Sequence, residues 1–256
     1  MAPHFDRYRA PRSNPHGFGM PHLEGPACAL SLLAVTWLMA GPPASERRIE
    51  PAGPTGVQGR SVPPFDRVRV DVPARVRVTG GAETHGIELR GPSDLLAVVA
   101  TEVAAGQLQV RLSRPVEDVK GLQIRIETPR LRDVSVRGEI RAQVEGVVAE
   151  TFEVHSEGAA QVAVSGQVGR LEVRAEGRTT VETHRLTTRS ATLRLTGSAE
   201  ATVAASERLR VEVRGVGTVR YRGSPAIERS IRGIATLEPL GTYHAAPAPQ
   251  SSPKSG

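Results

Sequence analysis

The sequence predicts an all-β protein: a parallel β-helix, or solenoid, with about 20 residues per turn, preceded by additional β-strands. Apolar and polar residues alternate along much of the chain, which is the period of a half-buried strand. Glycines recur at a nearly constant interval in the second half, and a repeat of this length without a helix matches one solenoid turn. Aromatic residues are only 3% of the 256 residues, so the core must consist of Val, Leu, Ile and Ala, which stack well in β structure.

Residues 1–45 have the order of a secretory signal peptide: a basic region, an apolar run and small residues. Three arginines precede the uncharged stretch 25–45, whose apolar run spans 27–40. A membrane-spanning helix needs about 20 apolar residues, which is more than this run contains. We therefore expect cleavage between 40 and 45, no transmembrane span in the mature chain, and export to the periplasm, the cell surface or the medium. An uncleaved anchor is the alternative, and Met20 is an alternative start to Met1.

Composition divides the rest of the chain. Clustered proline and glycine predict a flexible linker at 46–60, and the Ala-, Pro- and Ser-rich end predicts a disordered tail at 242–256. The folded part is then 61–241, with the regular β-helix at 131–240. Ahead of the β-helix, alternating runs predict strands at Val68–Val72, Arg75–Val78, Leu108–Leu112 and Leu122–Ile126, with one short helix at Ser93–Ala100.

A glycine repeat defines the turns of the predicted β-helix. The glycines are 20, 19, 20 and 20 residues apart, and a further one follows after 16. Glycine suits a corner between short strands because a sharp bend often needs a positive φ. The residues four positions before and after each glycine are almost all apolar, so these columns should face the core. The predicted corners are Gly138, Gly158, Gly177, Gly197 and Gly217, followed by Gly233.

An outer-membrane β-barrel is the rival all-β fold. Such a barrel needs aromatic girdles and an apolar outer face. This chain has eight Phe, Trp and Tyr residues in total, and Arg or Glu stands on the polar face of nearly every strand. Both features argue against the barrel.

The order of short motifs along 61–240 resembles the head GIN domain family of autotransporter adhesins. The motifs are Phe65–Val70, Leu95–Leu96 with Gly106–Val110, Ile124–Leu131, the glycine repeats and Gly217–Pro225. The resemblance implies an exported, right-handed β-helix, generally without an assigned function. The corners here read Ser-Glu-Gly, Ala-Glu-Gly and Leu-Thr-Gly where the family favours Gly-Ser-Gly, so a function tied to those corners is not carried over.

The chain is basic, with 33 Lys and Arg against 27 Asp and Glu and a formal charge of +6. A basic surface suits a polyanion such as an acidic polysaccharide. Solvated strands with alternating Arg and Glu are the plainer interpretation. Nucleic acid is not an expected partner because the sequence has no helix-turn-helix pattern, zinc spacing or aromatic-flanked basic strand.

Two polar columns precede the predicted corners. Five positions before the glycines stand Asp133, Glu153, Glu172, Thr192 and Glu212, and three positions before them stand Ser135, His155, Arg174, Arg194 and Arg214. Adjacent turns lie about 4.8 Å apart, so Arg174, Arg194 and Arg214 form a predicted ligand-binding ladder for successive anionic groups. The alternative is a surface on which these charges pair with each other.

We expect no enzyme site, cofactor or metal. Glu157 and Glu176 would lie one turn apart, near the roughly 5 Å of a retaining glycosidase pair, but any residues on consecutive turns have that separation. No Asp follows Asp133, which argues against an Asp-Ca²⁺ cluster. The histidines lack metal-ligand spacing, and Cys28 is the single cysteine. Phosphate-loop and nucleophile-elbow motifs are also missing.

The leading hypothesis is therefore an exported cell-envelope or surface module that binds a polysaccharide, another polyanion or an envelope protein. A polysaccharide lyase or hydrolase built on a β-helix is one alternative, which rests on analogy of fold. A structural spacer that assembles end to end through an uncapped turn is the other.

Overall fold

The structure is a computed structural model that describes residues 53–117 and 119–240. The predicted signal peptide and tail lie outside the described residues. Among the described residues, no helix is long and apolar enough to cross a membrane. The elements are β1 (Thr55–Arg60), β2 (Arg67–Val70), β3 (Ala74–Gly80), β4 (Gly86–Pro92), α1 (Ser93–Val98), β5 (Val99–Ala104), β6 (Gln107–Leu112), β7 (Gln123–Thr128), β8 (Asp133–Arg137), β9 (Ile140–Arg222) and β10 (Ala226–Pro239).

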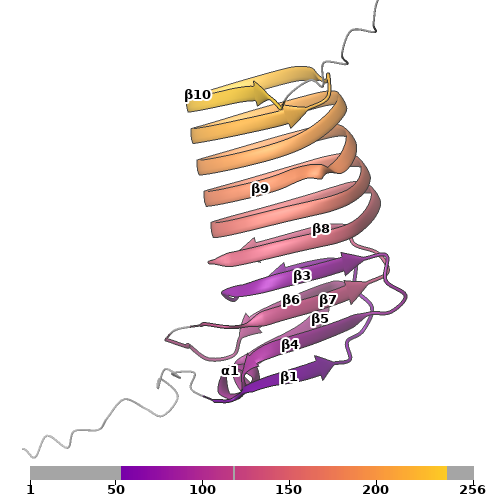
Figure 1. Cartoon of the computed structure of the whole chain (residues 1–256), viewed down its shortest axis with the longest axis vertical. Helices are drawn as coiled ribbons and strands as arrows, with labels where there is room; N and C mark the ends of the chain where they lie inside the picture. Colours follow the sequence, from indigo (N-terminus) through magenta and orange to yellow (C-terminus); the bar gives the residue numbers. More distant parts are fainter. Residues whose placement is uncertain (1–52, 118, 241–256) are drawn as a thin grey trace, which may run out of the picture. The chain divides into compact units, whose positions relative to one another are not determined.

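All ten strands belong to one sheet, in the order β1-β4-β7-β3-β9-β8-β2-β6-β5, with β10 paired to β9. β9 pairs with β3 through residues 140–145 and with β8 through residues 153–157. β9 thus joins two arms of the sheet, one that continues through β3, β7, β4 and β1 and one that continues through β8, β2, β6 and β5. Because both arms meet β9 within so few residues, the sheet curls and the arms enclose the core. Figure 1 shows this curl, with β1 and α1 at one end and β10 at the other.

β9 is a single strand of 83 residues that winds through stacked turns (Figure 1). Parallel pairing joins Val134 of β8 to Val154 of β9, one repeat further along the chain, and joins Leu209 of β9 to Ile227 of β10 in the same way. The sequence repeats therefore stack in parallel, and the all-β class is confirmed. The described sheet is a curled, open half-barrel, and a right-handed β-helix remains a prediction.

The predicted corner glycines have the positive φ expected of a corner, except at one position. Gly138, Gly158, Gly177 and Gly197 have φ between +97° and +106°, as a sharp corner requires. The next corner is Gly215, at φ +124°, whereas the prediction placed it at Gly217. A Cβ on Gly215 would lie 2.3 Å from the Gly197 carbonyl oxygen, so these two backbones are in direct contact.

The predicted register of the last turns was therefore wrong by two residues. Gly217 satisfied the regular spacing of the earlier glycines, but this turn is shorter than that spacing, and Gly233 is in register with Gly215. The feature that distinguishes the two glycines is a backbone contact: Gly215 touches the corner glycine of the previous turn, and Gly217 does not. Residue spacing contains no information on that contact.

The interior consists of aliphatic columns, and Phe65 and Phe152 are its only aromatic residues among those described. Alternate residues of each strand point inward, as in β7, where Ile124 and Ile126 are buried. Each buried Val, Leu or Ile contributes about 1.5–3 kcal/mol relative to exposure. A few threonines replace aliphatic residues in these columns. Thr183 Oγ1 donates a hydrogen bond of 2.9 Å to the Thr202 carbonyl, which satisfies its buried hydroxyl.

The N-terminal end begins earlier than predicted. β1 lies within the stretch 46–60 predicted as a linker, and it pairs antiparallel with β4. Its sequence, Thr-Gly-Val-Gln-Gly-Arg, has little apolar alternation, so the strand depends on its partner. The Arg60 guanidinium donates hydrogen bonds to the carbonyls of Val99 (2.7 Å) and Leu96 (3.1 Å).

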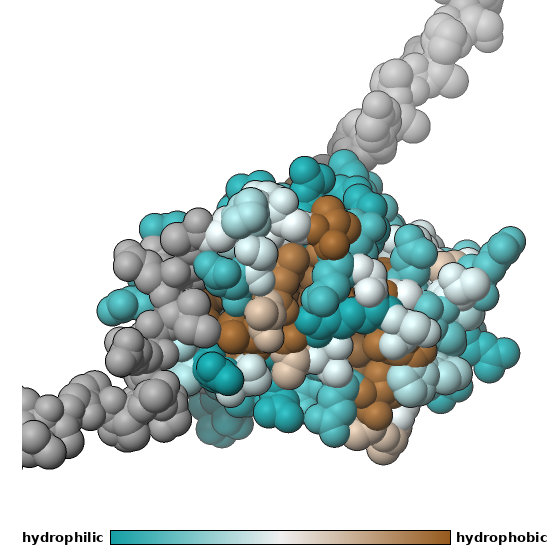
Figure 2. Space-filling view, turned by 90° about the horizontal axis from the view of Figure 1, so that it is seen from below, coloured by the Kyte–Doolittle hydropathy of each residue, from teal (hydrophilic) through white to brown (hydrophobic). Residues whose placement is uncertain are grey.

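The short helix predicted at Ser93–Ala100 is present as α1, which ends at Val98, and the last two predicted residues belong to β5. α1 buries Leu95 and Leu96 and packs against β1 and β4. Seen from this end, apolar residues are visible among hydrophilic ones (Figure 2). Val57 of β1 is one exposed apolar residue of this part of the chain, with 62% of its surface accessible.

β10 forms the opposite end of the described sheet. Ile227 and Ile231 are in register with buried Leu209 and Val213 of β9. They are nevertheless 37% and 38% exposed, because no further turn among the described residues covers them. β10 thus has one unpaired strand edge within the described sheet.

The register of the corner column predicts a difference between two neighbouring glycines. Gly215→Ala should destabilise the protein by about 1–3 kcal/mol, because alanine is strained at φ +124° and its Cβ would meet the Gly197 carbonyl. Gly217→Ala should lose less, because its nearest contact is the Val213 side chain at 3.2 Å. Chemical denaturation measures both, with Gly86→Ala as a control in open space. Equal losses for the first two variants would contradict the register.

Candidate functional site

The outer face of the sheet carries two rows of side chains that are candidates for binding. We call the first the charged column; it crosses successive turns of β8 and β9. We call the second the arginine cluster; it crosses β9, β3, β7 and β4. The charged column comprises Asp133, Glu153, Glu172, Arg210, Ser135, His155, Arg174, Arg194 and Glu212, and the arginine cluster comprises Arg75, Arg77, Arg90, Arg125 and Arg141.

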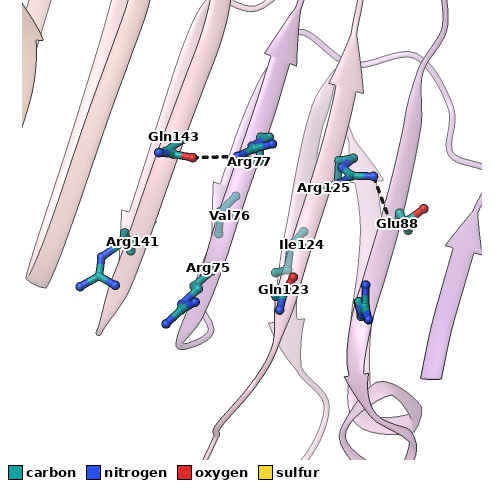
Figure 3. Close-up of a pocket in the computed structure, with 10 residues that line it drawn as sticks. Arg75, Val76, Arg77, Glu88, Gln123, Ile124, Arg125, Arg141 and Gln143 are labelled. Carbon is teal, nitrogen blue, oxygen red and sulfur yellow. Dashed lines mark hydrogen bonds and ion pairs between the residues drawn. The ribbon is translucent and has the colours of Figure 1, made fainter. Parts of the chain in front are cut away.

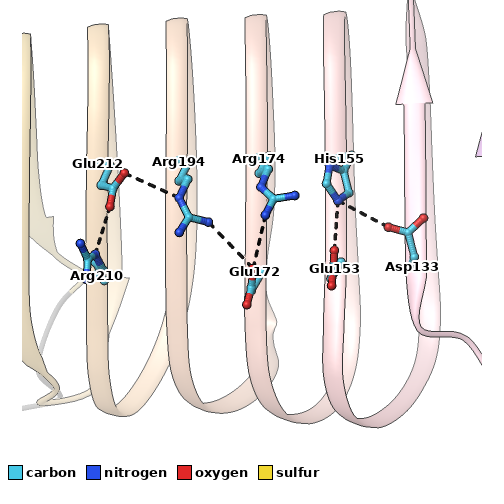
Figure 4. A network of polar contacts seen from close by, with 8 residues as sticks. All are labelled: Asp133, Glu153, His155, Glu172, Arg174, Arg194, Arg210 and Glu212. Atoms are coloured by element: carbon cyan, nitrogen blue, oxygen red, sulfur yellow. Dashed lines mark hydrogen bonds and ion pairs between the residues drawn. The ribbon is translucent and has the colours of Figure 1, made fainter.

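The structure brings together two of the three predicted ladder arginines. Arg174 and Arg194 occupy the same position on adjacent turns, and Glu212 follows them in that position (Figure 4). Arg214 lies two residues further along its strand, in register with Arg232 of β10. The cause is the shortened turn that ends at Gly215, which moves Glu212 to the place where the sequence predicted Arg214.

Ion pairs connect the members of the charged column. The Arg174 guanidinium lies 3.8 Å from the Glu172 carboxylate, and that of Arg194 lies 3.9 Å from the same carboxylate. Arg194 also lies 3.6 Å from Glu212, which in turn pairs with Arg210 at 3.0 Å. Acids and bases therefore alternate along these turns (Figure 4), and their fields largely cancel. This is the alternative of mutually paired charges that the sequence left open.

The N-terminal end of the column brings an imidazole to two carboxylates. His155 Nε2 lies 3.2 Å from Glu153 Oε2 and 3.6 Å from Asp133 Oδ2. Asp133, Glu153 and His155 are the described residues that could together ligate a metal ion, with ligand atoms within 4.8 Å of one another. The spacing of the histidines gave no signal for this group, because Asp133 comes from β8 and the other two residues from β9.

Burial is the largest influence on Asp133, and it raises the pKa of this carboxyl above its ordinary value. The nearby His155 and a 3.1 Å hydrogen bond from the Ser135 hydroxyl act in the opposite direction. The net result is a carboxylate that is less readily ionised in the folded protein than in the unfolded chain.

The glutamates considered as a glycosidase pair lie beside this column. Glu157 and Glu176 directly precede Gly158 and Gly177, which contact each other across adjacent turns. Glu157 forms a 2.8 Å ion pair with Arg137, its neighbour in β8. Glu157 would have to leave this ion pair to act as one of two catalytic carboxyls.

The arginine cluster was not predicted from the sequence. Cross-strand register places Arg75 directly opposite Arg141 on one side, and Arg77 directly opposite Arg125 on the other. Arg90 lies on β4 in register with Gln123. Together they line a depression of about 480 Å³ on the outer face, over the buried side chains of Val76 and Ile124 (Figure 3).

Acidic partners are scarce in the arginine cluster. Glu88 is the one carboxylate among the lining residues, and it lies 3.5 Å from Arg125. Arg77 donates to the neutral Gln143 side chain (3.2 Å) and Arg141 to Gln161 (2.8 Å). Within the described part of the chain, Arg75, Arg77, Arg90 and Arg141 form no ion pair. The cluster is therefore strongly cationic, unlike the charged column.

The sequence predicts that several of these arginines lie on the polar faces of their own strands, but it does not predict that they form one cluster. Alternation puts Arg75 and Arg77 on the polar face of one strand and Arg125 on that of another. Their meeting depends on which strands become neighbours: β7, which carries Arg125, lies between β3 and β4 in the sheet although both precede it in the chain. Periodicity within a strand has no information on that pairing.

The fold and these surfaces define a repeat-built all-β protein whose accessible polar chemistry lies in open rows of charged side chains. The chain belongs to the head GIN domain family. Residues 64–225 match the family model described as "Putative auto-transporter adhesin, head GIN domain". This match confirms the resemblance that the motifs indicated. None of the curated proteins matches the chain.

Solved structures of bacterial proteins are similar to this chain, and the first of those named below shares its fold. A putative adhesin from Bacteroides fragilis has a TM-score of 0.64 and 21% identity, covering 75% of this chain and 100% of that one. A putative lipid binding protein from Parabacteroides distasonis has a TM-score of 0.48 and 16% identity, covering 76% and 100%. A putative adhesin from Parabacteroides merdae has a TM-score of 0.46 and 15% identity, covering 76% and 99%.

The buried carboxyl of Asp133 predicts a pH-dependent stability. Its pKa is raised on folding, so ionised Asp133 disfavours the folded state above that pKa, and the penalty vanishes as pH falls through it toward the ordinary value of 3.8. Asp133→Asn should therefore be at least as stable as the wild type at pH 7 and lose any advantage near pH 4. Urea denaturation at both pH values measures this. The exposed Glu207→Gln serves as the control, and a difference for Asp133→Asn that stays constant with pH would contradict the assignment.

Proposed function

We propose that this protein is an exported binding module of the cell envelope or cell surface, whose stacked turns form a right-handed β-helix. The observation that carries the proposal is the outer face, where a long, rigid sheet presents rows of exposed arginines. Membership of a family described as adhesins supports a binding role. A repeat scaffold suits that role because it holds side chains at fixed intervals along a surface.

The proposed partner is an acidic surface polysaccharide or another polyanion, with an anionic patch on an envelope protein as the alternative. Arg174, Arg194 and Arg214 remain candidate ligand-binding residues. The first two would have to exchange the carboxylate of Glu172 for an anion of the ligand. Arg214 is exposed and has no ion pair within the described residues, so it is available to a ligand without such an exchange.

A lyase or hydrolase is the less favoured function. The Glu157 carboxylate is engaged by Arg137, so one member of the glutamate pair considered for glycosidase chemistry is already held in an ion pair. Release of reducing or unsaturated ends from acidic polysaccharides, abolished by Glu176→Gln, is the result that would support catalysis.

End-to-end assembly is a second candidate function, which the exposed edge of β10 favours. Among residues 53–117 and 119–240 no strand pairs with the outer edge of β10, and such an edge with half-exposed Ile227 and Ile231 can accept another strand. Light scattering that rises with protein concentration, and falls when Ile231 is replaced by Lys, would support assembly.

Export predicts a specific processing event. In a bacterial host the chain should be recovered from the envelope or medium with a new N-terminus between residues 41 and 46, because the apolar run 27–40 has the length of a cleaved signal. Mass spectrometry of the recovered protein measures the cleavage. Leu32→Arg/Leu33→Arg should block export by interrupting the apolar run, and a protein that stays uncleaved in the cytoplasm would contradict the proposal.

Binding of a polyanion predicts a strong dependence on salt. The exported protein should bind an immobilised acidic polysaccharide at low ionic strength and dissociate as salt rises, because the Debye length shortens from about 30 Å at 0.01 M to about 8 Å at 0.15 M. Surface plasmon resonance at several salt concentrations measures this, with neutral dextran as the control. No retention on any acidic polymer at low salt would refute polyanion binding.

A further inference from the structure

We propose that the arginine cluster on β9, β3, β7 and β4 is a binding site for an acidic polysaccharide, a polymer that carries repeated carboxylate or sulfate groups beside hydroxyl groups. The inference rests on the proposed function, and it places binding on a different surface from the predicted ladder. Its basis is a set of five exposed guanidinium groups that the tertiary structure gathers with one carboxylate (Figure 3).

The cluster consists of two parallel rows across four strands. Register places Arg141, Arg75, Gln123 and Arg90 side by side in the first row, and Gln143, Arg77, Arg125 and Glu88 in the second. With strands about 4.8 Å apart, each row spans roughly 14 Å. This length exceeds that of one anion, so the site is suited to a polymer with several charged groups.

Cross-strand repulsion argues against a merely structural role for these arginines. Like charges directly opposite each other on neighbouring strands destabilise a sheet. Such pairs occur twice here, between Arg75 and Arg141 and between Arg77 and Arg125. The charged column also places Arg174 beside Arg194, but there the Glu172 carboxylate lies 3.8 and 3.9 Å from the two guanidinium groups and compensates them. In the cluster only Arg125 has a carboxylate partner among the described residues, so the repulsion is left for a ligand anion to relieve.

The side chains between the arginines fit a hydroxylated polymer. Guanidinium groups bind carboxylate, sulfate or phosphate through paired N–H donors. Gln123 and Gln143 stand between and beside the arginines, and an amide can both donate to and accept from a sugar hydroxyl. The rows therefore offer both the charged and the neutral hydrogen bonds that an acidic polysaccharide needs.

The lining lacks the side chains that nucleic acids or membranes would need, which disfavours these two polyanions as ligands. No aromatic side chain lines the depression, so nucleic-acid bases would find no stacking platform. Val76 and Ile124 are its apolar residues, and both are buried beneath the arginines. An anionic membrane would thus meet charge without an apolar side chain to insert.

A second depression, of about 700 Å³, extends the surface along β9. It shares Arg75, Arg141 and Gln123 with the first and adds the exposed Arg178. Glu139 is the acidic residue of this lining. The arginines nevertheless extend from the N-terminal strands onto the stacked turns, as a track for a chain longer than the cluster itself.

The test compares matched double variants of the protein as purified from the expressing cell. Arg75→Gln/Arg141→Gln and Arg77→Gln/Arg125→Gln each remove one opposed pair, and Arg174→Gln/Arg194→Gln removes two arginines of the charged column. The probes are polygalacturonate and dextran sulfate, with neutral dextran, phosphatidylglycerol vesicles and single-stranded DNA as comparisons. We expect each cluster variant to bind both acidic polysaccharides at least about tenfold more weakly. The matched control is Arg111→Gln/Arg189→Gln, which removes two exposed, ion-paired arginines outside both surfaces and should bind like the wild type.

Melting temperature separates a binding role from a structural one. Removing an opposed arginine pair relieves repulsion, so both cluster variants should melt at or above the wild-type temperature while they lose binding. A lower melting temperature in both cluster variants would assign these arginines to folding and overturn the proposal.

The remaining outcomes are distinct. If the wild type binds neither acidic polysaccharide, polyanion binding fails together with this site. If the wild type binds and the cluster variants match it, this site fails alone, and loss in the charged-column variant would assign binding to the predicted ladder. Stronger wild-type binding to vesicles or to DNA than to both polysaccharides would overturn the assigned ligand class.

Discussion

Direct contact between the backbones of successive corners is the constraint on which the rest of this structure depends. A Cβ on Gly177 or Gly197 would lie 2.6 or 2.7 Å from the carbonyl oxygen of the corner glycine below it. No other residue fits, since the corner also requires a positive φ. The glycine column therefore fixes how each corner sits on the previous one, and with it the cross-strand neighbours on the strand that leads into the corner.

That register determines the electrostatics of the outer face. The turn that ends at Gly215 is shorter than the turns before it, which puts Glu212 beside Arg194 and moves Arg214 away. The charged column thereby becomes a chain of ion pairs, each at least partly exposed and worth little on its own. With a last turn of 20 residues, Arg174, Arg194 and Arg214 would have formed a cationic ladder. With the shorter turn that the structure has, the charged column is nearly neutral.

The opposite electrostatic character appears where β9 meets β3, β7 and β4. Here register opposes arginine with arginine, and Glu88 is the single acid within the depression. The same rule of cross-strand pairing thus produces one self-compensated surface and one surface with an excess of positive charge. A ligand anion gains more from the second, because it displaces no carboxylate from four of its five arginines.

The sequence by itself determined the family, the all-β class, the α1 helix and the inward columns, because alternation and the glycine interval are properties of neighbouring residues in the chain. It identified Arg174 and Arg194 as residues that share a position on adjacent turns. The tertiary structure decided that Gly215 is a corner, that β1 is a strand, and that His155 meets Asp133. It also assembled Arg75, Arg90, Arg125 and Arg141 into one cluster. The physical reason is that strand pairing and turn length are settled by backbone contacts between distant segments, on which periodicity within a strand is silent.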